Sequence, residues 1–155
     1  PIPAQTLILD QQEIPSGNAV AWSGLARLNL WREDPRLTQD LAQVVRQLPE
    51  VTGQTPHLAG ELLRVLDYAP LVARAVIIVG DPQEAGVASL LRVVRQRMGA
   101  GEGVAVIEST GLSAEWPSLA GRPKRDRKPT AYLCRGGVCL PPVTDAAALQ
   151  ELLAP

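Results

Sequence analysis

Two cysteines, Cys134 and Cys139, are the side chains of this chain best suited to redox chemistry. Four residues separate them, among them Gly136-Gly137, so the pair faces across a predicted β-hairpin. Cross-strand Cβ atoms lie about 4.5–5.5 Å apart, from which a small shift allows a disulfide. The pair is a disulfide or redox-sensitive site, half of a metal site, or two small buried side chains with free thiols. We favour free thiols, because cysteine is often buried and the spacing is not the C-x-x-C of an oxidoreductase.

Two polar corners are candidate pocket residues. Ser16, Gly17 and Asn18 stand at the start of a predicted helix, where backbone amides and the Asn18 carboxamide could line a pocket. Asp81 follows a predicted strand, at the end where ligands bind in α/β folds. All these residue types are also ordinary helix caps, and from the residues alone we favour the capping interpretation for both corners.

The sequence lacks residues that most familiar catalytic sites require. His57 is the single histidine, so a serine-type triad or a classical metal site has no second imidazole to draw on. Two cysteines do not fill a four-ligand zinc site. There is no G-x-G-x-x-G for a dinucleotide. The sequence therefore predicts no metal and no cofactor, names no catalytic residue, and favours no activity for this chain alone.

The charge balance bears on partners and location. Fifteen basic and 16 acidic residues give a net charge of -1, which argues against a nucleic-acid binder. Five cations lie between Arg122 and Lys128 without an interleaved aromatic residue, which favours a solvated loop. No apolar run reaches the length of a membrane span and no secretory pattern opens the chain. We therefore expect no membrane association and a cytoplasmic location.

The residues that position these sites begin with a helical segment over 1–72. A helix over 19–32 carries large apolar side chains on more than one stripe, which is typical of a helix buried on two sides. Asp34-Pro35 predicts the start of a second helix, which we expect to end at Pro49. Thr55-Pro56 predicts the start of a third helix, which we expect to end at Pro70.

An α/β domain is predicted over 73–155. Strands over 73–80 and 104–107 flank a helix that Asp81-Pro82 begins, so these strands should be parallel. A helical turn is expected over 113–120, a β-hairpin over 130–140, and a last helix capped at Thr144-Asp145. The predicted fold class is α/β, with helical hairpins packed on a small mixed-sheet domain. The order of its elements is also that of a thioredoxin-like core.

Several segments together resemble one family. IPSGNAVAWSGLARLNL and KPTAYLCRGGVCLPPVTDAAALQELL are its longest matching blocks, joined by VIIVGD and AGRP. The chain thereby resembles the thioredoxin-domain-containing proteins related to spermatogenesis-associated protein and bacterial YyaL. The resemblance implies the last hairpins of an α/α toroid and the terminal α/β domain of a longer protein. Arg127 departs from it where glycine is expected, and Arg135-Gly136-Gly137 departs from it where a linker with an aromatic residue is usual.

Three functions follow from this combination. The first is a non-catalytic structural or interaction module, whose partners are the remaining domains of the parent chain or a second copy bound through the apolar helix face. The second is part of an enzyme for carbohydrate-like or small polar substrates, with Ser16 and Asn18 in a pocket that other domains complete. The third is a redox- or metal-responsive module through Cys134 and Cys139. We rank them in this order.

Overall fold

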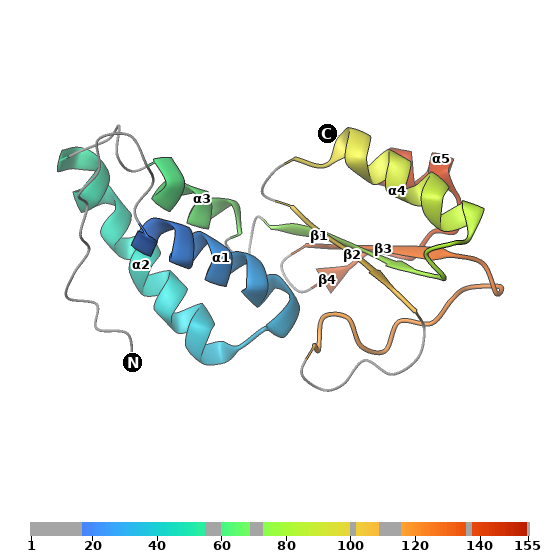
Figure 1. Cartoon of the computed structure of the whole chain (residues 1–155), viewed down its shortest axis with the longest axis horizontal. Coiled ribbons are helices and arrows are strands. Elements are labelled where there is room, and N and C mark those ends of the chain that lie inside the picture. Colours follow the sequence, from blue (N-terminus) through green and yellow to red (C-terminus); the bar gives the residue numbers. More distant parts are fainter. Residues whose placement is uncertain are drawn as a thin grey trace.

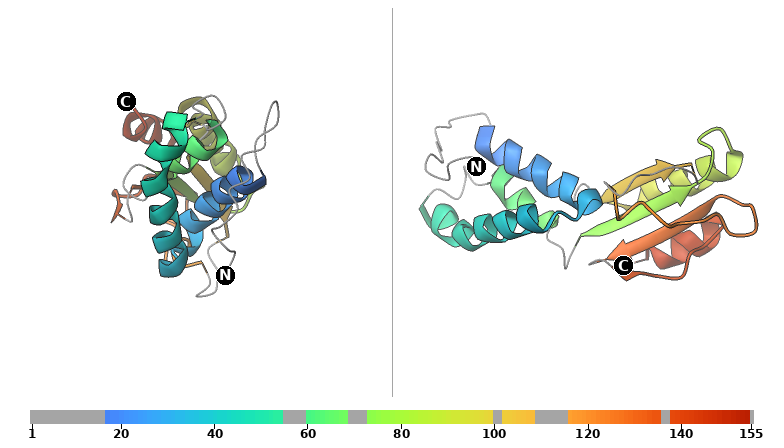
Figure 2. Two further views of the ribbon diagram at one scale, coloured as in Figure 1. Left: turned by 90° about the vertical axis from the view of Figure 1, so that its left-hand side faces the viewer. Right: turned by 90° about the horizontal axis from the view of Figure 1, so that it is seen from below.

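A computed structural model describes residues 17–54, 60–68, 73–99, 102–108, 116–135 and 138–154. Three helices come first, followed by a sheet with further helices on one side (Figure 1). The elements are α1 (Gly17–Arg32), α2 (Pro35–Gln54), α3 (Gly60–Asp67), β1 (Arg74–Val79), α4 (Ala85–Arg97), β2 (Gly103–Ile107), β3 (Thr130–Arg135), β4 (Val138–Cys139) and α5 (Ala146–Leu152). Seen from below, the helices α1–α3 lie beside one end of the sheet (Figure 2).

Helix α1 buries small side chains rather than large ones. Ala19, Ser23, Ala26 and Asn29 recur every three or four residues and form its buried stripe. Small residues allow a close approach, and α1 packs against both α3 and α2. The predicted burial on two sides is wrong at Val20 and Leu28, which are 50% and 38% exposed.

Helix α2 begins where Asp34-Pro35 predicts. The Asp34 Oδ1 accepts hydrogen bonds from the amides of Arg36 at 2.8 Å and Leu37 at 3.3 Å, which caps the first turn. The predicted end at Pro49 is wrong, because α2 continues to Gln54. Proline has no amide hydrogen, so the carbonyl one turn before Pro49 loses its usual helical partner. Because Pro49 lies on the exposed face of α2, water can bond that carbonyl instead.

Helix α3 starts at Gly60 and ends at Asp67. Leu62 and Val65 face the core of the helical half, whereas Leu66 is 38% exposed. The predicted start at Thr55-Pro56 and end at Pro70 lie outside the described residues.

The four strands form one mixed sheet in the order β2-β1-β3-β4. Strand β1 is parallel to β2 and antiparallel to β3, and β3 is antiparallel to β4. The α/β class and the predicted βαβ unit and hairpin are confirmed. The order β1-α4-β2-β3-β4-α5 agrees with the order of elements expected from the sequence.

Each face of the sheet contributes to a different core. Helices α4 and α5 cover one face of the sheet (Figure 1). Val76, Ile78 and Leu133 belong to the core on that face. Ile77, Val79 and Tyr132 point to the other face. That face is covered by Leu119, from a helical turn after Trp116, and by Trp31 at the end of α1. The second core therefore joins the end of α1 to the sheet.

Helix α4 begins later than predicted. Asp81 does not cap it: the Asp81 Oδ1 accepts from the amide of Gln83 at 2.8 Å, and the cap residue is Glu84. The segment 81–84 thus forms its own turn, because the aspartate bonds within that turn. Asp145 does cap α5 as predicted, accepting from the amide of Ala148 at 2.9 Å.

Candidate functional site

The two cysteines form a disulfide between adjacent strands. Cys134 in β3 and Cys139 in β4 are register partners, and their sulfur atoms are bonded. The amide of Leu140 donates to the carbonyl of Leu133 at 2.8 Å, so the cysteines occupy the neighbouring non-hydrogen-bonded position. Side chains are closest at such positions. The free thiols favoured from the sequence are therefore wrong for this structure.

Arg122 is the polar side chain that lies against the disulfide. Its Nη2 donates to Cys139 Sγ at 3.3 Å and to Cys134 Sγ at 3.8 Å, and its Nη1 donates to the carbonyl of Ala120 at 2.9 Å. Its guanidinium carbon lies 6.0 Å from the ring centroid of Tyr132. The Nε atom is buried without a hydrogen-bond partner. Within the described part of the chain, no carboxylate forms an ion pair with Arg122.

A cavity of about 430 Å³ opens over this arrangement, between the helices and the sheet. Arg122, Ser118 and the two cysteines line it from the sheet side, and Asn29, Glu33 and Thr38 from the helical side. Most of the remaining wall is apolar, with Leu41 and Val65 from α2 and α3 and Ile77 from β1. The cavity has the size of a small-molecule site, which is typically about 300–1,000 Å³.

The helical wall is fixed by the turn between α1 and α2. Asn29 donates through Nδ2 to Thr38 Oγ1 at 2.8 Å and accepts through Oδ1 from the amide of Asp34 at 2.9 Å. Glu33 ends α1 with a φ of 49°, a left-handed conformation that a side chain disfavours. Its Oε1 accepts from the buried Ser118 hydroxyl at 2.5 Å, which joins the helices to the sheet domain.

Gly17 and Asn18, from the predicted corner at the start of α1, lie away from this cavity. Ser16 is outside the described residues, Gly17 is exposed and Asn18 is half-buried. At 1.5 Å per helical residue, Asn18 is about 16 Å from Asn29 along the axis of α1. The structure therefore does not bring Gly17 or Asn18 to the cavity that the cysteines line.

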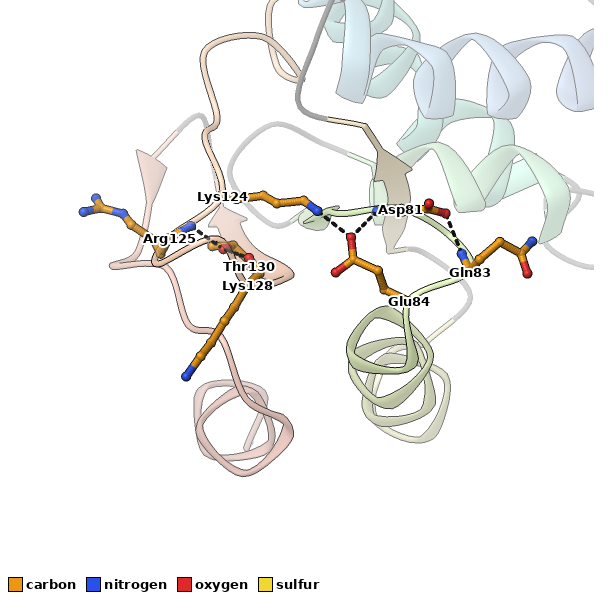
Figure 3. Close-up of polar contacts among 7 residues, drawn as sticks. All are labelled: Asp81, Gln83, Glu84, Lys124, Arg125, Lys128 and Thr130. Atoms are coloured by element: carbon orange, nitrogen blue, oxygen red, sulfur yellow. Dashed lines mark hydrogen bonds and ion pairs between the residues drawn. The ribbon is translucent and has the colours of Figure 1, made fainter.

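Asp81 lies in a second polar cluster, at the end of β1 (Figure 3). There Glu84 Oε1 accepts from the amide of Asp81 at 3.0 Å and pairs with Lys124 Nζ at 2.5 Å. The hydrogen bond from Lys124, followed by that from the Asp81 amide, lowers the pKa of Glu84 below its ordinary value of 4.5. The side chains of Arg125 and Lys128 point away from this pair in Figure 3, and both residues are exposed.

The basic run is thus divided among three environments. Arg122 faces the disulfide, Lys124 pairs with Glu84, and Arg125, Arg127 and Lys128 are exposed as expected of a solvated loop. Arg125 and Lys128 form a β-bridge around Asp126 and Arg127, whose φ values are 49° and 57°. Two successive positive φ values are typical of a tight hairpin turn that prefers glycine. This accounts for the glycine that the family resemblance leads one to expect at position 127.

Sequence reasoning did not identify three polar residues of the cavity: Arg122, Glu33 and Ser118. A charge within a run of charges looks like a solvated face, so Arg122 gave no separate signal.

Among the described residues, no group of three or more His, Cys, Asp or Glu side chains could hold a metal ion. None of the described helices combines the length and apolar character that crossing a membrane requires.

The chain is similar to spermatogenesis-associated protein 20 of Homo sapiens, with 24% identity over 144 residues. The same protein of Mus musculus is also 24% identical, over 142 residues. These matches cover 91% and 90% of this chain, but the chain spans only 18% of the length of either relative. No protein-family model matches the chain. No solved structure matches it either.

Proposed function

We propose that this chain is a non-catalytic structural and interaction module of a larger multidomain protein. The similarity runs along nearly the whole chain but along 18% of each relative, as expected of one module among several. The observation that carries the proposal is the outward face of α1 and α3. Helix α1 buries small side chains and α3 buries Leu62 and Val65, while both helices leave other large apolar side chains in water.

Four side chains define this outward face: Val20, Leu28, Leu63 and Leu66, which are between 38% and 50% exposed. Full burial of one such side chain is worth about 1.5–3 kcal/mol, so covering the exposed part of all four is worth on the order of 3 kcal/mol. A neighbouring helical hairpin of the parent protein is the occupant that we propose. It would continue the helical packing already present in α1–α3.

Paired substitutions test this proposal. Leu28→Gln and Leu66→Gln should lower the melting temperature of the longer protein more than that of the isolated chain. Leu140→Gln is the matched control, because Leu140 is a 45% exposed leucine in the other half of the molecule. Equal decreases in melting temperature in the longer protein and in the isolated chain would contradict a neighbouring hairpin on this face. Loss of self-association in the isolated variants, measured by sedimentation, would identify a second copy as the partner instead.

A redox-responsive role is a second candidate, and the contact between Arg122 and the two sulfurs favours it. A dithiol reductant would be oxidised to its own disulfide while Cys134 and Cys139 become thiols. The adjacent guanidinium would stabilise the thiolate form and so promote exchange. Cys139, whose sulfur is closer to Arg122, is the expected thiolate.

Native mass spectrometry with and without reductant, followed by thiol labelling, tests the redox role. We expect the folded, oxidised chain to gain two hydrogens on reduction and then to label at Cys139 first. Reduction that occurs only after unfolding would contradict a regulatory role and leave the disulfide a structural cross-link.

A further inference from the structure

We infer that the cavity between the helices and the sheet binds a small organic monocarboxylate with an apolar body. The inference is independent of the module proposal, because it concerns the inner wall of the helices rather than their outward face. It concerns the oxidised chain, in which Cys134 and Cys139 are bonded to each other.

The carboxylate site is the guanidinium of Arg122. This cation is half-buried in the cavity wall, and among the described residues its hydrogen bonds go to one carbonyl and two sulfurs. Disulfide sulfur is a weak acceptor, and the buried Nε has no acceptor. A carboxylate would supply both the missing charge and strong acceptor atoms, which is the pairing that guanidinium forms best.

The apolar body has a wall of matching character. Opposite the guanidinium, Leu41 and Val45 of α2, Val65 of α3 and Ala26 of α1 face the cavity. A ligand would therefore lie with its head toward β3 and β4 and its chain toward α2 and α3. Removal of that apolar chain from water would supply much of the affinity.

Glu33 limits the charge of the head group. Its carboxylate also lines the cavity, where it accepts from Ser118. Any anion in the cavity meets both Arg122 and the like charge of Glu33. Arg122 compensates one negative charge, but the second charge of a phosphate would have no cation to offset its repulsion from Glu33. The cavity therefore favours a single negative charge on an otherwise apolar molecule.

The test is calorimetric titration of the oxidised chain with octanoate, with octanamide as the neutral analogue and acetate as the head group alone. We expect octanoate to bind at least tenfold more tightly than octanamide and acetate to show no binding. Arg122→Gln should weaken the binding of octanoate at least tenfold, so that octanoate and octanamide bind with similar affinity. Arg127→Gln, which removes an exposed cation of the same run, should leave the affinity for octanoate unchanged.

A second variant keeps the test decisive if Arg122→Gln unfolds. Ala42 lines the cavity but is exposed, so Ala42→Phe should narrow the cavity without disturbing the core. We expect it to weaken octanoate at least tenfold while the circular dichroism spectrum is unchanged. Absence of octanoate binding, equal binding of octanamide, or unchanged binding by either folded variant would overturn the inference.

Discussion

Reducing the Cys134–Cys139 disulfide should cost this fold about 2 kcal/mol. The two residues are five positions apart, so the bond closes a small loop. A chain-entropy estimate for a loop of about six residues is roughly 7 cal/mol/K, or about 2 kcal/mol at 25 °C. Strand β4 has only two residues, and its Val138 is 71% exposed. Little apolar packing is therefore available to replace the cross-link.

Urea unfolding followed by far-ultraviolet circular dichroism measures this loss. With a slope of about 2 kcal/mol per molar urea, reduction should lower the midpoint by about 1 M. The Cys134→Ala/Cys139→Ala double variant is the control: its midpoint should be insensitive to reductant. A wild-type midpoint that reduction leaves unchanged, with both thiols shown to be free, would refute the reasoning. The hairpin would then be held by its backbone bonds and by the packing of β3 alone.

Three further perturbations have defined outcomes. Arg127→Gly should raise the free energy of unfolding by about 1 kcal/mol, because glycine accepts the φ of 57°; a lower melting temperature would contradict the turn geometry. Gly103→Ala should cost about 1–3 kcal/mol in chemical denaturation, because the new Cβ would stand 2.6 Å from Trp31 Cζ2; an unchanged midpoint would disprove this contact. Glu84 has a lowered pKa in the fold, so its pairing with Lys124 stabilises the folded state fully above about pH 4.5, and this stabilisation is lost as the pH falls through the lowered pKa. Melting temperatures of wild type and Glu84→Gln should therefore converge as the pH falls, and a constant difference would exclude the pairing.

Local signals predicted the sheet domain well. The β-branched runs identified β1 and β2, and Gly136-Gly137 identified the hairpin. Asp34 and Asp145 each bond to amides two or three residues onward, so their capping is encoded within one turn of the chain. Pro49 misled for a physical reason: a proline on an exposed helix face costs stability without ending the helix.

The cavity could not be predicted in the same way, because its contacts are distant in sequence. Glu33 reaches Ser118 across 85 positions, and Arg122 reaches Cys139 across 17. The wide apolar face of α1 was also misassigned. Hydrophobicity favours burying large side chains, whereas close packing against α3 selects small ones such as Ala26.

Helix α1 connects the two surfaces to which we assign functions. One side directs Val20 and Leu28 outward, where we place a neighbouring domain. Its C-terminal end rests on the sheet domain, where Arg32 lies 5.9 Å over the ring of Trp116 and Glu33 bonds Ser118. That same end forms one wall of the cavity. A domain that fixes α1 from outside would therefore also fix the width of the cavity. Docking and ligand binding would then be energetically coupled in both directions, without either surface touching the other.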